Sequence, residues 1–547
     1  MSQNRLLAVL LGVLAALVLV VGGLSAVLLL GGKSDESAGT TTSGGGGGGA
    51  GGDAKGVLRI PGSDPVTLDP HIAGDATSAE YIVEIYSGLV TISPKLDIEM
   101  DLAEKVEISQ DGKQYTFTLR ADATFHSGRK VTATDIKYSI ERASSKELQS
   151  PTAIAYLGDI VGVREHFAGL TKDVKGVEVI DERHVRFTID APKPYFLAKL
   201  TYPTAFVVDK TQIEGNPRNW SRKPNATGPY KLAEWRLGER IVLEANTKFY
   251  LGTPKLKEAN YLLAGGSALT RFENNELDIA SISVNDIDRA RDTKSDLNKV
   301  YKAWPQFSIA YIAFNTTVPP FDDPAVRRAM GMAIDRKRVA EITFKNMLQP
   351  ANGILMPQMP GYTPEDKTLQ YNLEAAKAEL AKSKYAGKMP PIQITEVGAG
   401  AEAAIDTQAF LELWKQIGLN ISIRQTDFAT FLADQDAGRL QAFNAGWIMD
   451  YPDPEDILDV KFHSTSPLND VDYKNPEVDK LLDAARIESN PARRLDLYRQ
   501  VEKKILDDAA WLPLYFSQSH VVVKDGVKNW FEPPMVVPRL RFIELAR

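Results

Sequence analysis

From residue 57 onward, segments in which apolar and polar residues alternate are interspersed with segments in which apolar residues recur every three or four positions. In QYTFTLR, Tyr115, Phe117 and Leu119 fall on one side and the intervening residues on the other. A period of two predicts a strand that is buried on one face.

The segment DDPAVRRAMGMAIDRKRV, residues 322–339, has the helical period instead. Asp323 is suited to cap a helix, and Pro324 is suited to its first turn. The basic residues between the apolar ones are expected to be solvated. The pattern predicts one helix with a single buried stripe, formed by Val326, Ala329, Met330, Ala333 and Ile334.

Residues 391–424 alternate between the two patterns. PIQITEV and LNISIRQ have strand character, and AFLELWKQIG between them places Phe410, Trp414 and Ile417 on one helix face, with Gly418 suited to end the helix. A strand, a helix and a second strand predict a βαβ unit in a mixed or parallel sheet. Open sheets of this kind bind ligands at the carboxyl ends of their strands.

The stretch NAGWIMDYPDPEDI, residues 444–457, follows the predicted strand LQAFNAGW and is interrupted by two prolines. Asp450 comes before the first proline and three residues after Trp447. A carboxylate beside an aromatic ring is suited to an ammonium group, and the alternative is a solvated loop acid. Asp453 and Glu455 precede DILDV and are expected mainly to favour the start of a helix.

The N-terminus has no such periodicity. Leu6 to Leu30 contains a single polar residue, Ser25, and is long enough to span a bilayer. With Arg5 before it, residues 1–33 are predicted to be an N-terminal transmembrane helix with its N-terminus in the cytoplasm, and a cleaved signal peptide is the alternative. Residues 34–56 are rich in glycine and predict a flexible linker.

Composition narrows the chemistry. The 547 residues include no cysteine, which excludes thiol chemistry. The net charge is −7, which argues against a nucleic-acid partner. The six histidines are scattered, and the chain contains no HExxH, GxSxG or GxxxxGK[ST] motif. We therefore expect no metal, no cofactor and no enzymatic activity. A hydrolase with paired carboxylates is disfavoured because no second acid recurs at a fixed spacing on another element.

Several blocks, in order along the chain, resemble the bacterial extracellular solute-binding proteins of the peptide/nickel class, family 5, which serve ABC importers. These blocks are TLDPH (67–71), IYSGLV (85–90), the run from Leu102 to Arg142, NATGPYKLAEW (225–235), NNELDIA, AFNTTVPPFDDPAVRRAMGMAID and YKNPEVDKLLDAAR.

The resemblance implies an α/β fold, a two-lobed periplasmic-binding-protein-like clamp with an extra domain, in which the ligand is buried as the lobes close. It implies a base lobe of residues 57–86, 222–305 and 519–547, an extra domain of residues 87–221, and a second lobe of residues 306–518.

The resemblance also implies a site. Gly446, Trp447 and Asp450 match positions at which peptide-binding members hold the ligand, with the Asp paired to its α-ammonium group. The loop around Ala76 and Thr152 in SPTAIAY resemble places where members contact the ligand from the other lobe. Asn444 stands where some oligopeptide binders have an arginine that helps to hold the ligand carboxylate, so the ligand stays open.

The implied function is that of the substrate-binding component of an ABC importer. Such a protein captures a peptide or similar small solute and delivers it to permease and ATPase subunits. It works outside the cytoplasm, here tethered to the cytoplasmic membrane by the N-terminal helix. The alternatives are a non-peptide solute, such as an oligosaccharide, a nickel complex or a haem complex, and a ligand sensor.

Overall fold

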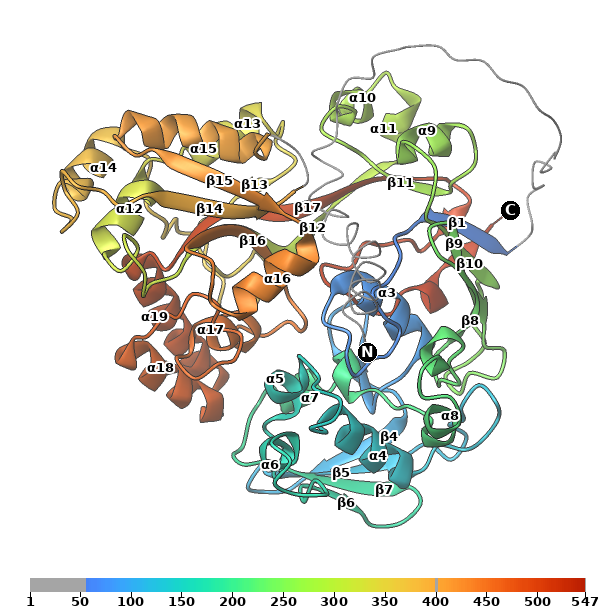
Figure 1. Ribbon diagram of the computed structural model, residues 1–547. Helices are drawn as coiled ribbons and strands as arrows, with labels where there is room; N and C mark the ends of the chain where they lie inside the picture. The colour runs from blue at the N-terminus through green and yellow to red at the C-terminus, as the bar shows by residue number, and fades with distance from the viewer. Residues whose placement is uncertain (1–55, 399–401, 547) are drawn as a thin grey trace, which may run out of the picture.

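The computed structural model describes residues 56–398 and 402–546, which form two lobes (Figure 1). The lobe at the left in Figure 1 contains helices α12 to α19, and an extra domain lies below the other lobe. The predicted membrane helix and nearly all of the predicted linker fall outside the described residues. Within the described part of the chain, no helix is both long and apolar enough to cross a membrane.

A mixed sheet lies at the centre of the left-hand lobe and continues into the other lobe. Its strand order is β11–β17–β12–β16–β14–β15, with β13 paired to β17. The strands are β11 (Ile279–Ser281), β12 (Tyr301–Phe314), β13 (Gln349–Pro350), β14 (Ile392–Val397), β15 (Ile421–Thr426), β16 (Ala442–Ile448) and β17 (Trp511–Val523).

The predicted βαβ unit is confirmed. Strands β14 and β15 are parallel and adjacent, and α15 (Ile405–Gln416) connects them. Phe410 and Trp414 are fully buried, and Gly418 follows the helix with a φ of +88°. Strand β16 is parallel to β14, so the residues after β16 lie at the carboxyl ends of both strands.

The helix expected over residues 322–339 is in fact two helices. Asp323 caps α12 (Pro324–Met332) by accepting the Ala325 backbone N–H at 2.9 Å. The chain then turns, and α13 (Arg336–Ile342) begins after Asp335. The apolar stripe is buried as predicted.

The prediction that the basic residues between the apolar ones are solvated is wrong for Arg327, which is buried. The Arg327 guanidinium donates to the backbone carbonyls of Asp508 and Ala509 at 2.6–3.2 Å. These carbonyls lie at the end of α19, where a helix leaves acceptors unsatisfied. The guanidinium is therefore buried because it caps another helix.

The remaining helices of this lobe lie on both sides of the sheet and below it (Figure 1). They are α14 (Leu373–Leu380), α16 (Phe428–Asp436), α17 (Glu455–Phe462), α18 (Pro476–Ile487) and α19 (Pro491–Asp508).

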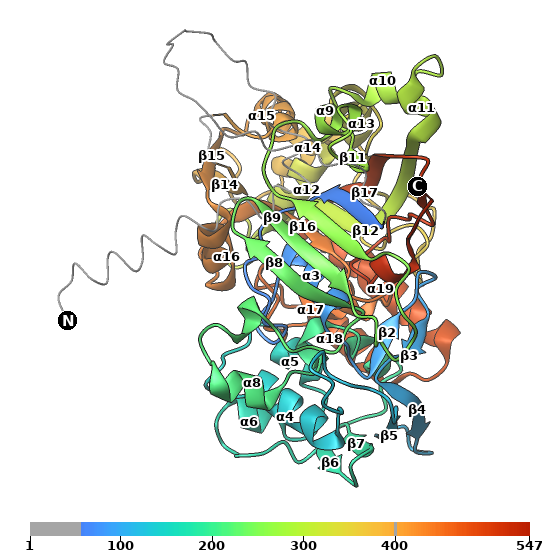
Figure 2. The same ribbon diagram turned by 90° about the vertical axis from the view of Figure 1, so that its right-hand side faces the viewer.

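The base lobe is built on a second sheet with the order β1–β10–β9–β8, seen face-on in Figure 2. Helix α3 packs against it, and a group of short helices lies beside β11. These elements are β1 (Val57–Pro61), β8 (Tyr230–Arg236), β9 (Arg240–Ala245), β10 (Glu258–Leu262), α3 (Ala76–Ile85), α9 (Ala268–Glu273), α10 (Ile287–Arg291) and α11 (Asp296–Val300).

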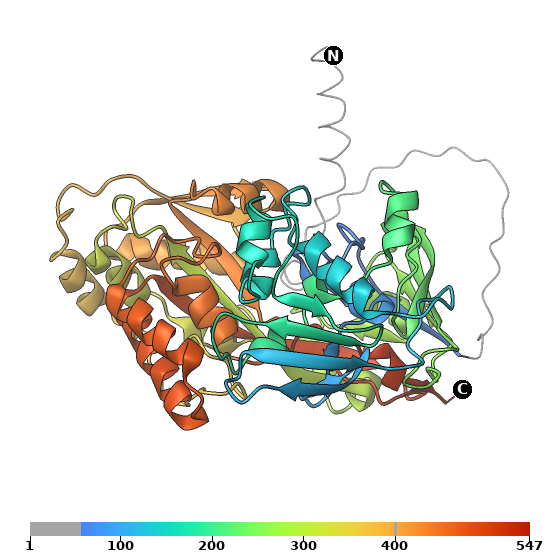
Figure 3. The ribbon, with the colours of Figure 1, turned by 90° about the horizontal axis from the view of Figure 1, so that it is seen from below.

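The extra domain has its own apolar core around an antiparallel sheet of order β4–β5–β7–β6. The predicted strand is β5, with Tyr115, Phe117 and Leu119 buried. Figure 3 shows this domain beside the helices of the second lobe. Its elements are β4 (Ala103–Ile108), β5 (Gln114–Leu119), β6 (Val177–Val179), β7 (His184–Thr188), α4 (Ala133–Ala143), α5 (Ala153–Leu157), α6 (Val163–Phe167), α7 (Phe196–Lys199) and α8 (Lys210–Gly215). Between this domain and the base lobe, β2 (Val90–Ile92) and β3 (Ile98–Met100) form a short ribbon.

Candidate ligand-binding site

The second lobe contributes the segment that joins β16 to α17. Gly446, which is exposed, and Trp447, which is half-buried, lie near the end of β16. Asp450 follows two residues after the strand ends. The Lys461 ammonium already lies over the Trp447 ring, 4.9 Å from its centroid. One face of the indole is therefore occupied, and Asp450 is left as the stronger candidate for holding a cation.

The Asp450 carboxylate faces the extra domain. Its Oδ2 atom accepts a hydrogen bond from the Tyr156 hydroxyl. Its backbone N–H donates to Oδ2 of Asp456 at 2.8 Å. Burial raises the pKa of Asp450 to about 7, and the Tyr156 hydrogen bond opposes that rise.

Asp456 lies behind Asp450 and is fully buried. Burial raises the pKa of its carboxyl group well above the usual range, and the neighbouring Asp450 carboxylate adds to the effect. Among the described residues, neither Asp450 nor Asp456 forms an ion pair. A half-buried carboxyl group beside a fully buried one, without a cation, makes it costly to ionise both together, so a positively charged ligand would stabilise them.

Two stacked tyrosines line the opposite side. The rings of Tyr156 and Tyr202 are 3.8 Å apart and nearly parallel, and Tyr451 meets the edge of Tyr156 from the second lobe. Burial raises the pKa of Tyr202, and the carboxylates of Asp450 and Asp75 add to it. Tyr202 therefore lies within electrostatic reach of both carboxylates, which belong to different lobes.

Ala76 and Thr152 border the same region. Ala76 is the first residue of α3, so it lies at a helix N-terminus and not in a loop as expected. Thr152 precedes α5, one turn before Tyr156, and its hydroxyl shares a 2.5 Å hydrogen bond with that of Thr204. Gly74 lies close to the Thr152 side chain, so the two predicted regions of this side are adjacent.

Ion pairs surround the site. Lys199, at the end of α7, contacts Glu455 at 3.0 Å. Arg494 of α19 contacts Asp453 at 2.6 Å and lies over the Tyr195 ring of the extra domain. Asp453 and Glu455, the two acids between Asp450 and Asp456 in the sequence, are thus paired with basic residues of the protein itself.

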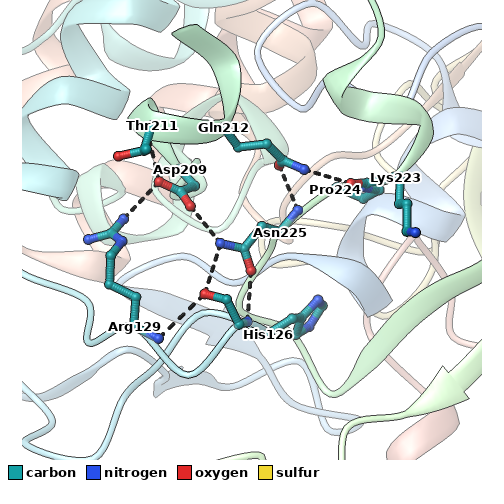
Figure 4. A pocket seen from close by; sticks show the side chains of 9 residues that line it. His126, Arg129, Asp209, Thr211, Gln212, Lys223, Pro224 and Asn225 are labelled. Carbon is teal, nitrogen blue, oxygen red and sulfur yellow. Dashed lines mark hydrogen bonds and ion pairs between the residues drawn. The ribbon is translucent and has the colours of Figure 1, made fainter. Parts of the chain in front are cut away.

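Figure 4 shows a different hollow, at the junction of the extra domain and the base lobe. Several of its polar groups bond to one another: Asn225 bonds to Asp209 at 2.5 Å and to Ser127 at 2.8 Å, and Asp209 pairs with Arg129 at 3.0 Å. None of the predicted site residues lines it. Its network holds the two parts of the base together.

The structure thus brings Asp450 into contact with α5, the helix that begins after Thr152. Sequence reasoning missed Tyr156, Tyr202, Lys199 and Asp456. Tyr156 lies one helical turn after Thr152, a spacing that could have indicated it. Lys199 lies in an apolar run with no local feature of a ligand site. Within the described residues, no group of three or more His, Cys, Asp or Glu is placed to hold a metal ion.

Comparison with known families settles the class. The description "Bacterial extracellular solute-binding proteins, family 5 Middle" matches residues 97–469, more than half of the chain. The chain belongs to this family. Its members are solute-binding proteins of ABC importers, as the ordered sequence blocks had implied, and they act outside the cytoplasm.

Individual relatives agree with this assignment. The chain is similar to the dipeptide-binding protein DppE of Bacillus subtilis, with 27% identity over 86% of this chain and 89% of DppE. The solved structure of the Escherichia coli murein tripeptide binding protein MppA is 26% identical, covers 90% of this chain and 98% of its own, and gives a TM-score of 0.80. The two-lobed α/β fold is confirmed.

The same MppA in its unliganded open form gives a lower TM-score of 0.69 over 90% of this chain and 97% of its own. The sequence of MppA is the same in both comparisons, so the difference reflects the arrangement of its parts. The present arrangement is thus less similar to the open form than to the other MppA structure.

Proposed function

We propose that this protein is the substrate-binding component of an ABC importer for peptides, and that the ligand binds between the lobes with its amino end at Asp450. The relatives named for dipeptide and tripeptide binding support the ligand class. The single observation that carries the site is the half-buried Asp450 carboxylate at the lobe interface, which has no ion pair among the described residues.

The charges at the interface favour a cationic amino end. Lys199, Arg494 and Lys461 already pair with carboxylates at 2.6–3.0 Å. An arriving ammonium group would meet Asp450, with Asp456 behind it. Gly446 and Trp447 would form the wall beside the anchor, and Ala76 and Thr152 would approach the ligand from the opposite side. A charge-assisted hydrogen bond formed away from water is the strongest contact that such a site offers.

Closure would take place about the two strands that run between the lobes. Strands β12 and β17 pair in register from Tyr301 to Pro305, and the register then shifts between Pro305 and Ile309 and again between Ala310 and Tyr311. This supports lobe boundaries near residues 305 and 518, and hence a base lobe of residues 57–86, 222–305 and 519–547. An irregular ladder bends more readily than a regular one.

The N-terminal segment fits the same role. We propose that the apolar run from Leu6 to Leu30 tethers the protein to the cytoplasmic membrane and that the glycine-rich residues 34–56 let the two lobes reach a permease. The support is the length and the apolar character of the run.

The decisive experiment is calorimetric titration of Asp450→Asn. Mass spectrometry of the solute released from the denatured parent protein identifies the ligand. If the purified protein carries no solute, trialanine is used as the probe. Removing one partner of a buried charge pair typically costs about 2–5 kcal/mol, roughly a 30-fold to several-thousand-fold loss of affinity. We expect that loss, with folding nearly unchanged.

Asp507→Asn is the matched control, because its carboxylate is exposed on the same lobe. It should bind like the parent. Equal affinities for Asp450→Asn and the parent would remove Asp450 as the amine anchor, and a released solute that is not a peptide would overturn the ligand class.

A further inference from the structure

The extra domain and the second lobe are joined by a buried ion pair that the ligand site does not require. Lys199 Nζ lies 3.0 Å from Oε1 of Glu455, and the two side chains are 5% and 4% exposed. Lys199 ends α7 and Glu455 begins α17, so the pair joins one helix of each part. The pair lies beside the Tyr156–Asp450 contact, because α17 begins five residues after Asp450.

Lys199 is held in place from its own side. Its ammonium bonds to Oδ2 of Asp159 and to the Ala155 carbonyl, both at 3.1 Å. Asp159 in turn accepts from Lys193 at 2.5 Å, and Lys193 also contacts the exposed Asp190. These partners all belong to the extra domain, so Lys199 has the same support whether or not the lobes are closed. Such preorganisation lowers the entropy cost of forming the interlobe pair.

Glu455 is supported from the second lobe in the same way. The Tyr451 hydroxyl donates to Oε2 of Glu455, which leaves Oε1 directed at Lys199. Apolar contact continues across the interface, since Tyr156, Ala198 and Tyr202 of the extra domain share one core with Tyr451 and other residues of the second lobe. The ion pair is therefore closed off from water only while the lobes are together.

We propose that Lys199 and Glu455 are positioning residues of the solute site, whose ion pair holds the extra domain against the second lobe and so sets how much of the protein is closed. This inference rests on the proposed function at one point, namely that the lobes close in order to capture a solute. Removing Lys199 leaves the buried Glu455 carboxylate without its cation, whereas removing Glu455 leaves Lys199 paired with Asp159 of its own domain. Either change removes the pair between the lobes, but the closed state should tolerate the double change better than Lys199→Met alone.

The consequence for binding follows from population shifts. If a ligand binds only the closed state, its apparent affinity equals its affinity for that state multiplied by the fraction of protein that is closed. Lys199→Met and Glu455→Gln should weaken binding without touching a ligand contact.

The test measures closure in the empty protein, so it does not depend on the identity of the ligand. The chain has no cysteine, so Leu170→Cys in the extra domain and Lys503→Cys in the second lobe can be spin-labelled specifically. Leu170 is 77% exposed and the Lys503 side chain 70%. Interspin distances are recorded for the parent, Lys199→Met, Glu455→Gln and the double variant.

We expect Lys199→Met to lower the closed-to-open ratio by about tenfold or more. Glu455→Gln should lower the ratio by less, because Lys199 keeps Asp159, and the double variant should recover much of the loss seen in Lys199→Met. Lys367→Met is the matched control: its partner Glu502, 2.7 Å away, is buried within the second lobe. It should lower the melting temperature and leave the interspin distances unchanged.

Interspin distances like those of the parent in both single variants would overturn the proposal. So would a double variant in which the two single effects on the closed-to-open equilibrium simply add. Circular dichroism establishes that each variant is folded. If Lys199→Met does not fold, Glu455→Gln, which is nearly isosteric with the parent residue, still provides the test. The solute released from the denatured parent tests the proposed function separately, so either idea can fail alone.

Discussion

At the residue scale, four acids lie within seven positions, yet each has a different environment. Asp453 accepts the Glu455 backbone N–H at 2.9 Å, as expected for a helix start, and also pairs with Arg494. Glu455 lies in the first turn of α17, as expected, and its carboxylate also reaches across to Lys199 of the extra domain. Asp450 and Asp456 have no ion pair among the described residues. The four carboxylates differ because of the groups that fold against them and not because of their local sequence.

The half-buried Asp450 carboxyl group predicts a pH dependence of stability. Burial raises its pKa to about 7, whereas an unfolded Asp titrates near 4. Between these values the folded protein holds more protons than the unfolded chain, so this residue's contribution to stability falls as pH rises from about 4 to about 7. Asp450→Asn mimics the protonated form. We expect the melting temperature of the empty variant, relative to the parent, to increase between pH 5 and pH 8.

Differential scanning calorimetry across that range measures the difference. Asp507→Asn, whose carboxylate is exposed, should give a difference that does not depend on pH. A constant or falling difference for Asp450→Asn would show that the Asp450 carboxylate is not desolvated in the empty protein.

At the element scale, the ends of the helices decide how each segment contributes. Helix α12 ends at Met332 although the apolar stripe continues, because the chain turns before Asp335 caps α13. Helix α15 instead ends at a glycine: Gly418 has a φ of +88° and lets the chain turn into β15. A residue with a Cβ atom is strained in that conformation.

Substitution by alanine should therefore change stability in opposite directions at two glycines that both have space for a Cβ atom. Neither Gly418 nor Gly215 has an atom within 4 Å of an added Cβ, but only Gly418 has a positive φ. Gly418→Ala should lower the free energy of unfolding by about 1 kcal/mol. Gly215→Ala, at the end of α8, should be neutral or slightly stabilising. Urea denaturation of both variants gives the comparison, and equal values would contradict the conformational explanation.

At the scale of the whole molecule, few connections join the two lobes. Strands β12 and β17 run from one lobe into the other, and the remaining contacts come from surfaces that meet when the lobes are together. The arrangement is less similar to the open MppA form, with its TM-score of 0.69. Apart from the two strands, the contacts between the lobes are therefore made by the surfaces that meet.

The whole molecule also carries the prediction about the membrane. The apolar run from Leu6 to Leu30 should keep the full-length protein with membranes during high-salt washing, because burial of apolar surface is insensitive to charge screening. Removing residues 1–55 should yield a folded protein that still binds its ligand. Membrane fractionation with immunoblotting measures this, and a native N-terminus near residue 27 would favour the cleaved signal peptide.

Local patterns in the sequence were enough to predict several elements and the family. The strand β5 and the order β14–α15–β15 could be predicted because the spacing of apolar residues indicates both the type of element and its buried face. The ordered blocks identified the two-lobed clamp, and the strand end before Asp450 follows from two prolines. Only the tertiary structure decided what Asp450 meets: Tyr156 is 294 residues away in the chain. It also decided that Arg327 is buried and that Lys199 faces Glu455. Contacts between lobes depend on how two separately packed cores approach each other, and no local pattern of residues encodes that approach.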